Sequence, residues 1–279
     1  MAQNRRLIEY AAVVVVAVLI ASGVSYFIGP RQGGASTANS TLDRIKSSGV
    51  LRAAVPASAG LPYATRDASG NMIGYLPDVW AELAKSMGVR LEMIDTPDAS
   101  RIPFIQAGRL DTALGTTTLE RAKAVSFSNP INVDGTAGAV LRSSGITSYE
   151  QAQGKRVATI TGGSGEAVAA KLFPGATTTR LEGSGTALQA LKSGQVDITI
   201  DNYTYLQAAA KDDPNILVLP AASVEPAGLM VPYGDMQWAA YLNYFIDDYW
   251  GSAVSTCGCL KQTYEKWFKA VPLAPIPLY

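Results

Sequence analysis

The sequence lacks histidine and carries few charges. Its 279 residues include no His, two Cys, and Asp, Glu, Lys and Arg at only 16%. Without His there is no Ser-His-Asp or Cys-His catalysis, no His-ligated zinc and no histidine pH switch. An enzyme of this composition has to rely on Asp, Glu, Lys, Tyr or Ser. The absence therefore favours a binding protein.

The chain also has no excess of charge. Lys and Arg number 23, as do Asp and Glu, so the formal net charge is zero. A neutral chain argues against a nucleic-acid partner, which requires a basic surface. Hydrophobic residues make up 48% of the chain, which excludes a disordered protein. The length allows one large domain or two modest ones.

One long hydrophobic run stands near the N-terminus. Tyr10 to Ile28 is 19 residues without a charge and follows Arg5 and Arg6. As a helix the run would be about 28 Å long, which matches the apolar thickness of a bilayer. Residues 1–28 therefore predict either a signal peptide cleaved near Ala21-Ser22-Gly23 or an uncleaved membrane anchor. A buried helix is the less favoured reading.

No Cys follows this run, so no lipoprotein anchor is expected. Residues 29–41 are rich in Gly, Ser and Thr and predict a flexible linker. Both cysteines lie in Cys257-Gly258-Cys259. An even count in an exported protein suggests a disulfide, but so short a ring would be strained, and a pair of free thiols stays open. Two thiols without His make a metal site improbable.

From residue 42 onward, strand patterns alternate with helix patterns, which predicts parallel βαβ units. The pattern occurs twice, and the two units are joined by extended apolar segments near 133–141 and 221–231. We therefore expect an α/β protein with two lobes and a ligand cleft between them. The predicted helices include 42–48, 76–87, 100–107, 147–151, 165–172, 185–192, 202–211, 236–249 and 260–268, and the predicted strands include 50–55, 91–94, 110–114, 133–141, 156–160, 177–181, 196–200, 216–218 and 228–232.

Three polar segments follow predicted strands. Gly115-Thr116-Thr117 offers backbone groups and hydroxyls, and Arg121 can bind a carboxylate with two parallel hydrogen bonds. Ser164 precedes a predicted helix whose free N–H groups favour anions, although an ordinary N-cap is an equal alternative. Asp201-Asn202 is either an ammonium site or a simple turn.

Several short segments carry a resemblance to a known family, and they occur along the chain in the family's order: Leu51–Val55, Pro62–Asp67, Gly70–Val79, Asp111–Lys123, Phe127–Pro130, Gly154–Val157, Leu188–Asp197, Glu225–Asp235 and Tyr264–Phe268. Together they resemble extracellular solute-binding proteins family 3, the receptors of polar amino-acid ABC importers. The resemblance covers roughly residues 41–270. It implies a two-lobed periplasmic binding protein fold of type II, with lobes joined by two crossover strands and preceded by the N-terminal hydrophobic helix.

The resemblance also implies an organisation and a setting. Lobe one would comprise residues 42–134 and 228–279, and lobe two residues 135–227. The protein would be a monomer outside the cytoplasmic membrane, in the periplasm or on the outer face of that membrane. It would need no cofactor, and its partners would be an amino acid and a membrane ABC permease.

By the same resemblance, Arg121 and Ser164 would hold the ligand carboxylate together with a Thr hydroxyl, for which Thr117 is favoured over Thr116. The Gly115 carbonyl and an acidic side chain would hold the ammonium group. Asp201 is favoured for that role, and Asn202 is the alternative. Tyr63 would form a wall of the cleft.

The sequence departs from the family where the ligand side chain would bind. The usual stacking aromatic is replaced by Gly60, an upstream acidic residue by Ala57, and an acid of the next motif by Leu76, whereas Asp78 is kept. The side-chain preference therefore cannot be carried over. Two alternatives stay open: a periplasmic dehydratase of prephenate or arogenate type with Glu166 as general acid, and, less favoured, the receptor domain of a membrane sensor.

Overall fold

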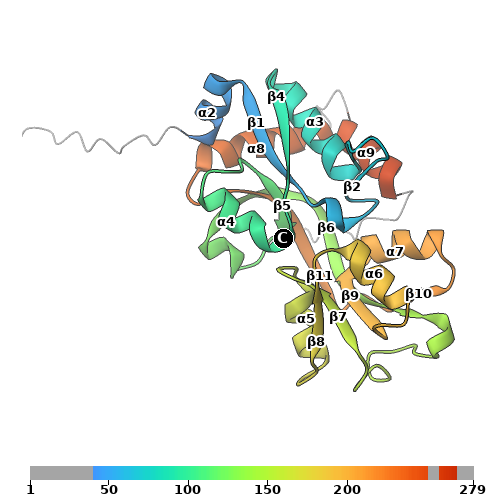
Figure 1. The fold of residues 1–279 in the computed structure, drawn as a ribbon. Coiled ribbons are helices and arrows are strands. Elements are labelled where there is room, and N and C mark those ends of the chain that lie inside the picture. The colour runs from blue at the N-terminus through green and yellow to red at the C-terminus, as the bar shows by residue number, and fades with distance from the viewer. Residues whose placement is uncertain (1–39, 251–257, 269–279) are drawn as a thin grey trace, which may run out of the picture. The chain divides into compact units, whose positions relative to one another are not determined.

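A computed structural model of the protein describes residues 40–250 and 258–268 (Figure 1). The predicted signal peptide or anchor and nearly all of the predicted linker lie outside the described residues. Within the described residues, no helix has both the length and the hydropathy needed to cross a membrane. The linker prediction is wrong at its end, because Ser40 caps the first described helix, α2 (Thr41–Ser48), by accepting a hydrogen bond from the Asp43 amide at 3.3 Å.

The first part of the chain forms a βαβ unit. Strands β1 (Val50–Val55) and β4 (Arg90–Asp95) pair in parallel, and helix α3 (Tyr75–Met87) connects them. Apolar residues spaced for one helix face bury Trp80, whose indole Nε1 donates to the carbonyl of Ala54 in β1 at 2.9 Å. We call the elements from α2 to η3, together with helices α8 and α9, the β1 group; the remaining members are η1 (Ala57–Ala59), β2 (Thr65–Arg66), β3 (Met72–Ile73), η2 (Asp98–Ser100), α4 (Arg101–Gln106), β5 (Ala113–Thr116), η3 (Arg121–Lys123), α8 (Met236–Trp250) and α9 (Cys259–Phe268).

Residues 142–218 form a second set of elements, the β7 group. Strand β7 (Val157–Ile160) lies parallel to both β8 (Thr178–Leu181) and β9 (Ile198–Asn202). Val157 and Ile198 form a core cluster with Val140, Phe173 and Leu219. Other apolar residues of this group, such as Leu191 and Leu206, belong to the larger cluster that also contains Trp80. The other elements are η4 (Arg142–Ser144), α5 (Gly165–Leu172), α6 (Ser184–Lys192), α7 (Tyr203–Asp212) and β10 (Ile216–Val218).

Two long strands connect the groups. Strand β6 (Val125–Leu141) leads into the β7 group and β11 (Ser223–Pro232) leads back, and Figure 1 shows the two running side by side. They pair antiparallel, and the sheet order is β5-β11-β6-β9-β7-β8 with β10 also on β6. The prediction of parallel units is thus confirmed within each group, and the predicted extended segments that join the units are the antiparallel strands β6 and β11.

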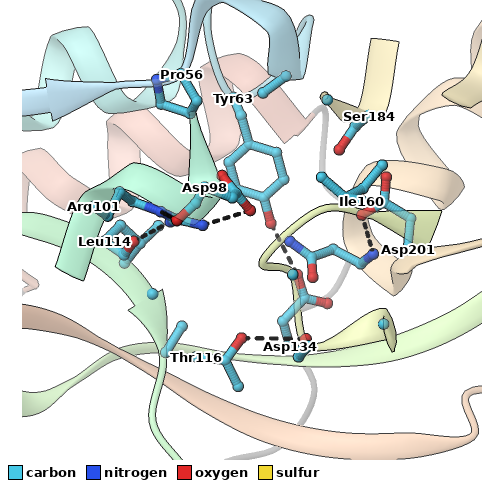
Figure 2. Close-up of a pocket in the computed structure, with 18 of the residues that line it drawn as sticks. Pro56, Tyr63, Asp98, Arg101, Leu114, Thr116, Asp134, Ile160, Ser184 and Asp201 are labelled. Carbon is cyan, nitrogen blue, oxygen red and sulfur yellow. Dashed lines mark hydrogen bonds and ion pairs between the residues drawn. The ribbon is translucent and has the colours of Figure 1, made fainter. Parts of the chain in front are cut away.

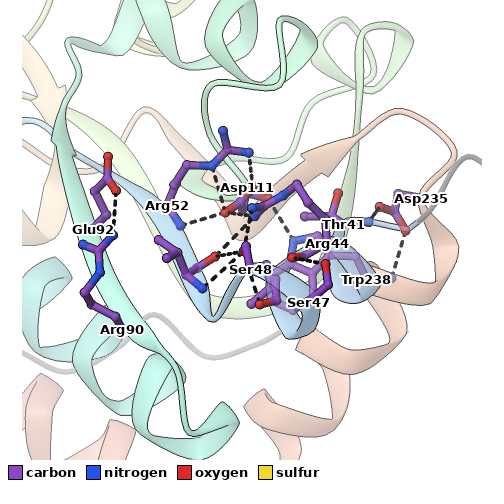
Figure 3. Close-up of polar contacts among 12 residues, drawn as sticks. Thr41, Arg44, Ser47, Ser48, Arg52, Arg90, Glu92, Asp111, Asp235 and Trp238 are labelled. Atoms are coloured by element: carbon purple, nitrogen blue, oxygen red, sulfur yellow. Dashed lines mark hydrogen bonds and ion pairs between the residues drawn. The ribbon is translucent and has the colours of Figure 1, made fainter.

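A buried carboxylate fixes the β1 group internally. Asp111 is 1% exposed and accepts from the Arg52 amide at 2.7 Å and from Arg52 Nη2 at 2.8 Å (Figure 3). Arg44 forms a second ion pair with it. The Asp111 carbonyl accepts from Trp238 Nε1 at 2.9 Å. The carboxylate of Asp111 thus joins α2 and β1 through two cations, and its backbone carbonyl adds a contact to α8.

Most predicted elements are confirmed to within a few residues. The predicted helix at 147–151 is wrong, because those residues form a turn. The Gln151 side chain accepts from the Thr147 amide at 2.7 Å, and Tyr149 donates to the Pro220 carbonyl at 2.7 Å. So short a helix would leave most of its backbone groups unpaired, whereas these side-chain bonds satisfy the turn.

Candidate functional site

A cavity lies where the β1 group, the β7 group and the connecting strands meet (Figure 2). It contains about 820 Å³ of empty space, part of which is open to solvent. Its lining comes from strand ends, from the N-termini of α5 and α6, and from the loop before β2. The predicted residues Tyr63, Gly115, Thr116, Arg121, Ser164, Asp201 and Asn202 all line it, and Thr117 does not.

The position of Thr117 follows from strand geometry. Strand β5 continues through Thr116, which pairs with Ala227 of β11, so successive side chains point to opposite faces. The Thr117 hydroxyl is buried with no hydrogen-bond partner, and its amide donates to the Pro226 carbonyl at 2.8 Å. The structure thus brings Thr116 to the cavity rather than the favoured Thr117.

Arg121 is the cation of this cavity that lacks a carboxylate partner. Its Nη1 donates to the Thr116 carbonyl at 3.0 Å, and its Nη2 donates to the Gly162 carbonyl at 2.8 Å. No ion pair found among the described residues includes Arg121, and burial lowers its pKa, as does the nearby charge of Arg101. Two neutral carbonyls fix the guanidinium plane and leave several N–H donors and the full charge available.

Ser164 faces the same space. It occupies the N-cap position of α5, as the alternative reading predicted, but its side chain makes no capping hydrogen bond. Its hydroxyl instead lies 3.5 Å from the Thr116 hydroxyl and 3.4 Å from the Thr136 hydroxyl. The start of α5, the hydroxyl-bearing residues Thr116 and Ser164, and Arg121 therefore line the same cavity, an arrangement suited to an anion.

Asp201 supplies the opposite charge. It belongs to strand β9 rather than to a turn after it, and it is 7% exposed. One carboxylate oxygen accepts from the Asn202 amide at 2.7 Å, and the other has no hydrogen-bond partner. The pKa of Asp201 is raised to about 7. Burial is the main cause and the carboxylates of Asp98 and Asp134 add to it, whereas hydrogen bonds from the Ser184 hydroxyl and the Asn202 amide oppose the rise. A buried carboxylate without a cation is costly and favours a positively charged ligand.

Tyr63 forms one wall, and its hydroxyl donates to Asp134 at 2.9 Å (Figure 2). The ring stacks near Tyr205 with 6.3 Å between centroids. The position of the missing aromatic, Gly60, adopts φ +77° and lies beside Gly185 of the β7 group. A Cβ at Gly60 would come within 3.6 Å of the Tyr205 hydroxyl, and Tyr63 is the aromatic residue among those that line the cavity.

Sequence reasoning missed several lining residues. Arg101 forms an ion pair with Asp98 at 2.5 Å and also donates to the Leu114 carbonyl. Asn132 lines the cavity with a buried Oδ1 that has no partner. Asp134 is the clearest omission, because a lone carboxylate inside an apolar strand is itself a signal. The spacing that predicted helix 100–107 gave no sign that Arg101 is buried.

Glu166, the general acid of the dehydratase alternative, is not among the lining residues. Its carboxylate lies 3.0 Å from Arg180 Nε. A carboxylate paired with an arginine outside the cavity is poorly placed to protonate a ligand within it.

Known proteins match this chain over most of its length. The glutamine-binding protein of Geobacillus stearothermophilus is 30% identical over 201 residues, which is 70% of this chain and 77% of that protein. The glutamate/aspartate import solute-binding protein of Salmonella typhimurium is 26% identical over 276 residues, 93% and 88% of the two chains. An ancestral amino acid-binding protein, a precursor of cyclohexadienyl dehydratase, has a similar structure with TM-score 0.75 and 29% identity over 82% of this chain and all of the other.

These relatives share an α/β fold of periplasmic binding proteins, and this chain has it too. The family model for bacterial extracellular solute-binding proteins, family 3, matches residues 51–270. This match spans more than half of the chain and includes every cavity residue described above. The protein is a member of the bacterial extracellular solute-binding proteins, family 3.

Proposed function

We propose that the cavity binds an amino acid, or a similar small zwitterion, outside the cytoplasm for delivery to an ABC importer. The observation that carries this proposal is a pair of unmatched opposite charges facing one cavity. Arg121 is held only by carbonyls, and Asp201 has one carboxylate oxygen without a partner. An α-amino acid supplies one carboxylate and one ammonium group, which would compensate both.

Arg121 would hold the carboxylate with two parallel hydrogen bonds, assisted by the hydroxyls of Thr116 and Ser164 and the amides at the start of α5. Asp201 would hold the ammonium group, assisted by the Gly115 carbonyl, with Asn202 beside it. Tyr63 would cover the ligand. These positions all line the cavity, whereas Thr117 would act only through the backbone of this turn.

The names of the relatives support an amino acid as ligand. They include binding proteins for glutamine and for glutamate and aspartate. A solute receptor for L-cysteine of Neisseria gonorrhoeae also has this fold, with TM-score 0.74 and 25% identity. Import is part of the name of the Salmonella typhimurium relative, and one solved structure of this fold is described as the substrate binding protein of an amino acid ABC transporter. Which side chain this cavity accepts is a separate question, because Gly60 replaces the family's stacking aromatic.

We assign the two groups to the two lobes: residues 42–134 and 228–279 to lobe one, and 135–227 to lobe two. Strands β6 and β11 would act as the hinge that lets the lobes close on a ligand. Contacts across the cavity support a closed arrangement here, since Ser58 donates to the Glu182 carbonyl at 3.4 Å and Arg121 bonds Gly162. Export would depend on residues 1–28, as a signal peptide or as an anchor.

We propose a binding protein rather than a dehydratase, because the paired state of Glu166 removes the acid that the alternative needs. Isothermal titration calorimetry with the twenty amino acids and with prephenate separates the two. Binding of at least one amino acid, with unchanged prephenate absorbance after incubation, is the expected result. Turnover of prephenate, or no amino-acid binding at millimolar concentration, would overturn the proposal.

A further inference from the structure

Asp134 is a second carboxylate of the cavity, and its surroundings differ from those of Asp201. It lies on β6, the strand that connects the two groups, and is 6% exposed. Burial raises its pKa, and hydrogen bonds from Thr204, Gly135 and Tyr63 oppose that rise. No ion pair found among the described residues includes Asp134. Hydrogen bonds from uncharged groups therefore stabilise this carboxylate.

Those donors come from three different segments. One oxygen, Oδ1, accepts from the Gly135 amide of its own strand at 2.7 Å and from the Thr204 amide of α7 at 3.1 Å. The other oxygen, Oδ2, accepts from the Thr204 hydroxyl at 2.5 Å and from the Tyr63 hydroxyl at 2.9 Å. Tyr63 belongs to the β1 group and Thr204 to the β7 group. One side chain on the connecting strand thus joins both groups.

The four bonds also leave little capacity for a ligand. A carboxylate has about four lone-pair positions, and all four acceptor positions of Asp134 are occupied by protein donors. Asp134 lines the cavity but is not arranged to accept a further hydrogen bond. Its influence on a ligand must therefore pass through the groups that it holds.

Tyr63 is the group through which that influence can pass. Its ring packs edge-on against Phe268 with 5.2 Å between centroids and lies near Tyr205. These contacts restrict the ring, but the hydroxyl is fixed by Asp134 and by the Thr204 hydroxyl 3.2 Å away. Figure 2 shows the hydroxyl of Tyr63 pointing toward Asp134 across the cavity wall.

We propose that Asp134 is a positioning residue for ligand binding: it holds Tyr63 against the start of α7 and so fixes the walls that the two groups contribute to the cavity. The proposal rests on the proposed function, because it assumes that Tyr63 covers an amino-acid ligand. The network itself can be tested without any ligand.

The ligand-free test is amide hydrogen exchange on the full chain carrying Asp134→Asn. The amide of Ala64 donates to the Gly60 carbonyl at 3.0 Å, and that of Leu76 donates to the Tyr63 carbonyl at 3.1 Å. These two amides report on the segment that holds Tyr63. We expect faster exchange there as well as at Gly135 and Thr204. Faster exchange confined to Gly135 and Thr204 would show that Asp134 does not hold Tyr63, and would overturn the proposal.

The matched control is Asp197→Asn. Asp197 is also an aspartate that accepts several bonds, from the Arg156 amide at 2.9 Å and from its Nε and Nη2, but it does not line the cavity. We expect this variant to speed exchange at the Arg156 amide, which donates to Asp197, and not at Ala64 or Leu76. A variant that merely loosens the fold would instead affect both segments alike.

The second test is a double-mutant cycle with glutamine, glutamate, aspartate and cysteine as probes. We expect Tyr63→Phe and Asp134→Asn each to weaken binding about 10-fold, and the double variant to weaken it by about the same factor, because one acts through the other. Additive losses near 100-fold would instead indicate a direct ligand contact and overturn the positioning role. If none of the twenty amino acids binds the wild type while exchange at Ala64 and Leu76 responds as expected, the proposed function fails and the network stands.

Discussion

Asp111 and Asp201 are both buried aspartates, yet their surroundings are opposite. The carboxylate of Asp111 pairs with Arg44 and Arg52 and accepts from the Arg52 amide, and its backbone carbonyl accepts from the Trp238 indole. Asp201 has only neutral donors, the Asn202 amide and the Ser184 hydroxyl, and one of its oxygens has no hydrogen-bond partner. Removing a charge from water costs free energy unless an opposite charge compensates it. The difference indicates that Asp111 stabilises the fold, whereas Asp201 is available to bind a positively charged ligand.

The two arginines that line the cavity show the same contrast. Arg101 is paired with Asp98 at 2.5 Å, so its charge is cancelled within the protein. Arg121 bonds two neutral carbonyls, and its charge is not cancelled. Arg101 and Asp98 neutralise each other within the protein. Arg121 and Asp201 have no oppositely charged partner among the described residues, so a zwitterion can bind both.

The largest effect is expected from Arg121→Gln. Losing a charge-assisted, two-bond contact should weaken amino-acid binding about 100- to 1000-fold, while stability changes little because only carbonyl bonds are lost. Calorimetry against the best amino acid measures this. Arg180→Gln, which breaks only the exposed pair with Glu166, is the matched control and should leave affinity unchanged. Equal affinities for the two variants would contradict the comparison.

The next effect is expected from Asp111→Ala. It leaves the guanidinium groups of Arg44 and Arg52, which are 33% and 25% exposed, without their carboxylate. Loss of one partner of a buried pair costs about 3–5 kcal/mol, and partial exposure places this case near the lower value. Urea unfolding should show that loss, with amino-acid affinity preserved. A loss of affinity without a loss of stability would reverse the roles assigned to Asp111 and Asp201.

A smaller effect is expected from pH. The pKa of Asp201 is about 7, so below pH 7 the carboxylate is protonated in the free protein and must lose its proton to hold an ammonium group. Affinity should therefore be constant above about pH 8 and fall by up to about 10-fold per pH unit from pH 7 to 5. Calorimetry across this pH range measures the affinity. An affinity of the wild type that does not change with pH would show that Asp201 does not bind the ammonium group.

The sequence predicted the α/β class, both groups and most of the cavity, because these rest on local periodicity and on the ends of strands. It predicted Asp201 and Arg121 as charges at those ends. It failed for Thr117, whose direction depends on where β5 stops, and for Asp134, whose four donors come from segments far apart in the chain. Local sequence patterns predict poorly where a strand ends and hence which way a side chain points, and they do not predict hydrogen bonds between segments far apart in the chain.

The central claim is that Asp201 is kept uncompensated for a ligand, and thermal unfolding of Asp201→Asn tests it most directly. The folded-state pKa lies above the unfolded value of about 3.9, so the ionised carboxylate destabilises the free protein as pH rises from about 4, and fully so above about 7, at about 1.4 kcal/mol per pKa unit. We predict that the free variant melts higher than the wild type at pH 8, equally at pH 4, and that the amino acid no longer raises its melting temperature. A variant that melts lower than the wild type at pH 8 and is still stabilised by the amino acid would contradict the account.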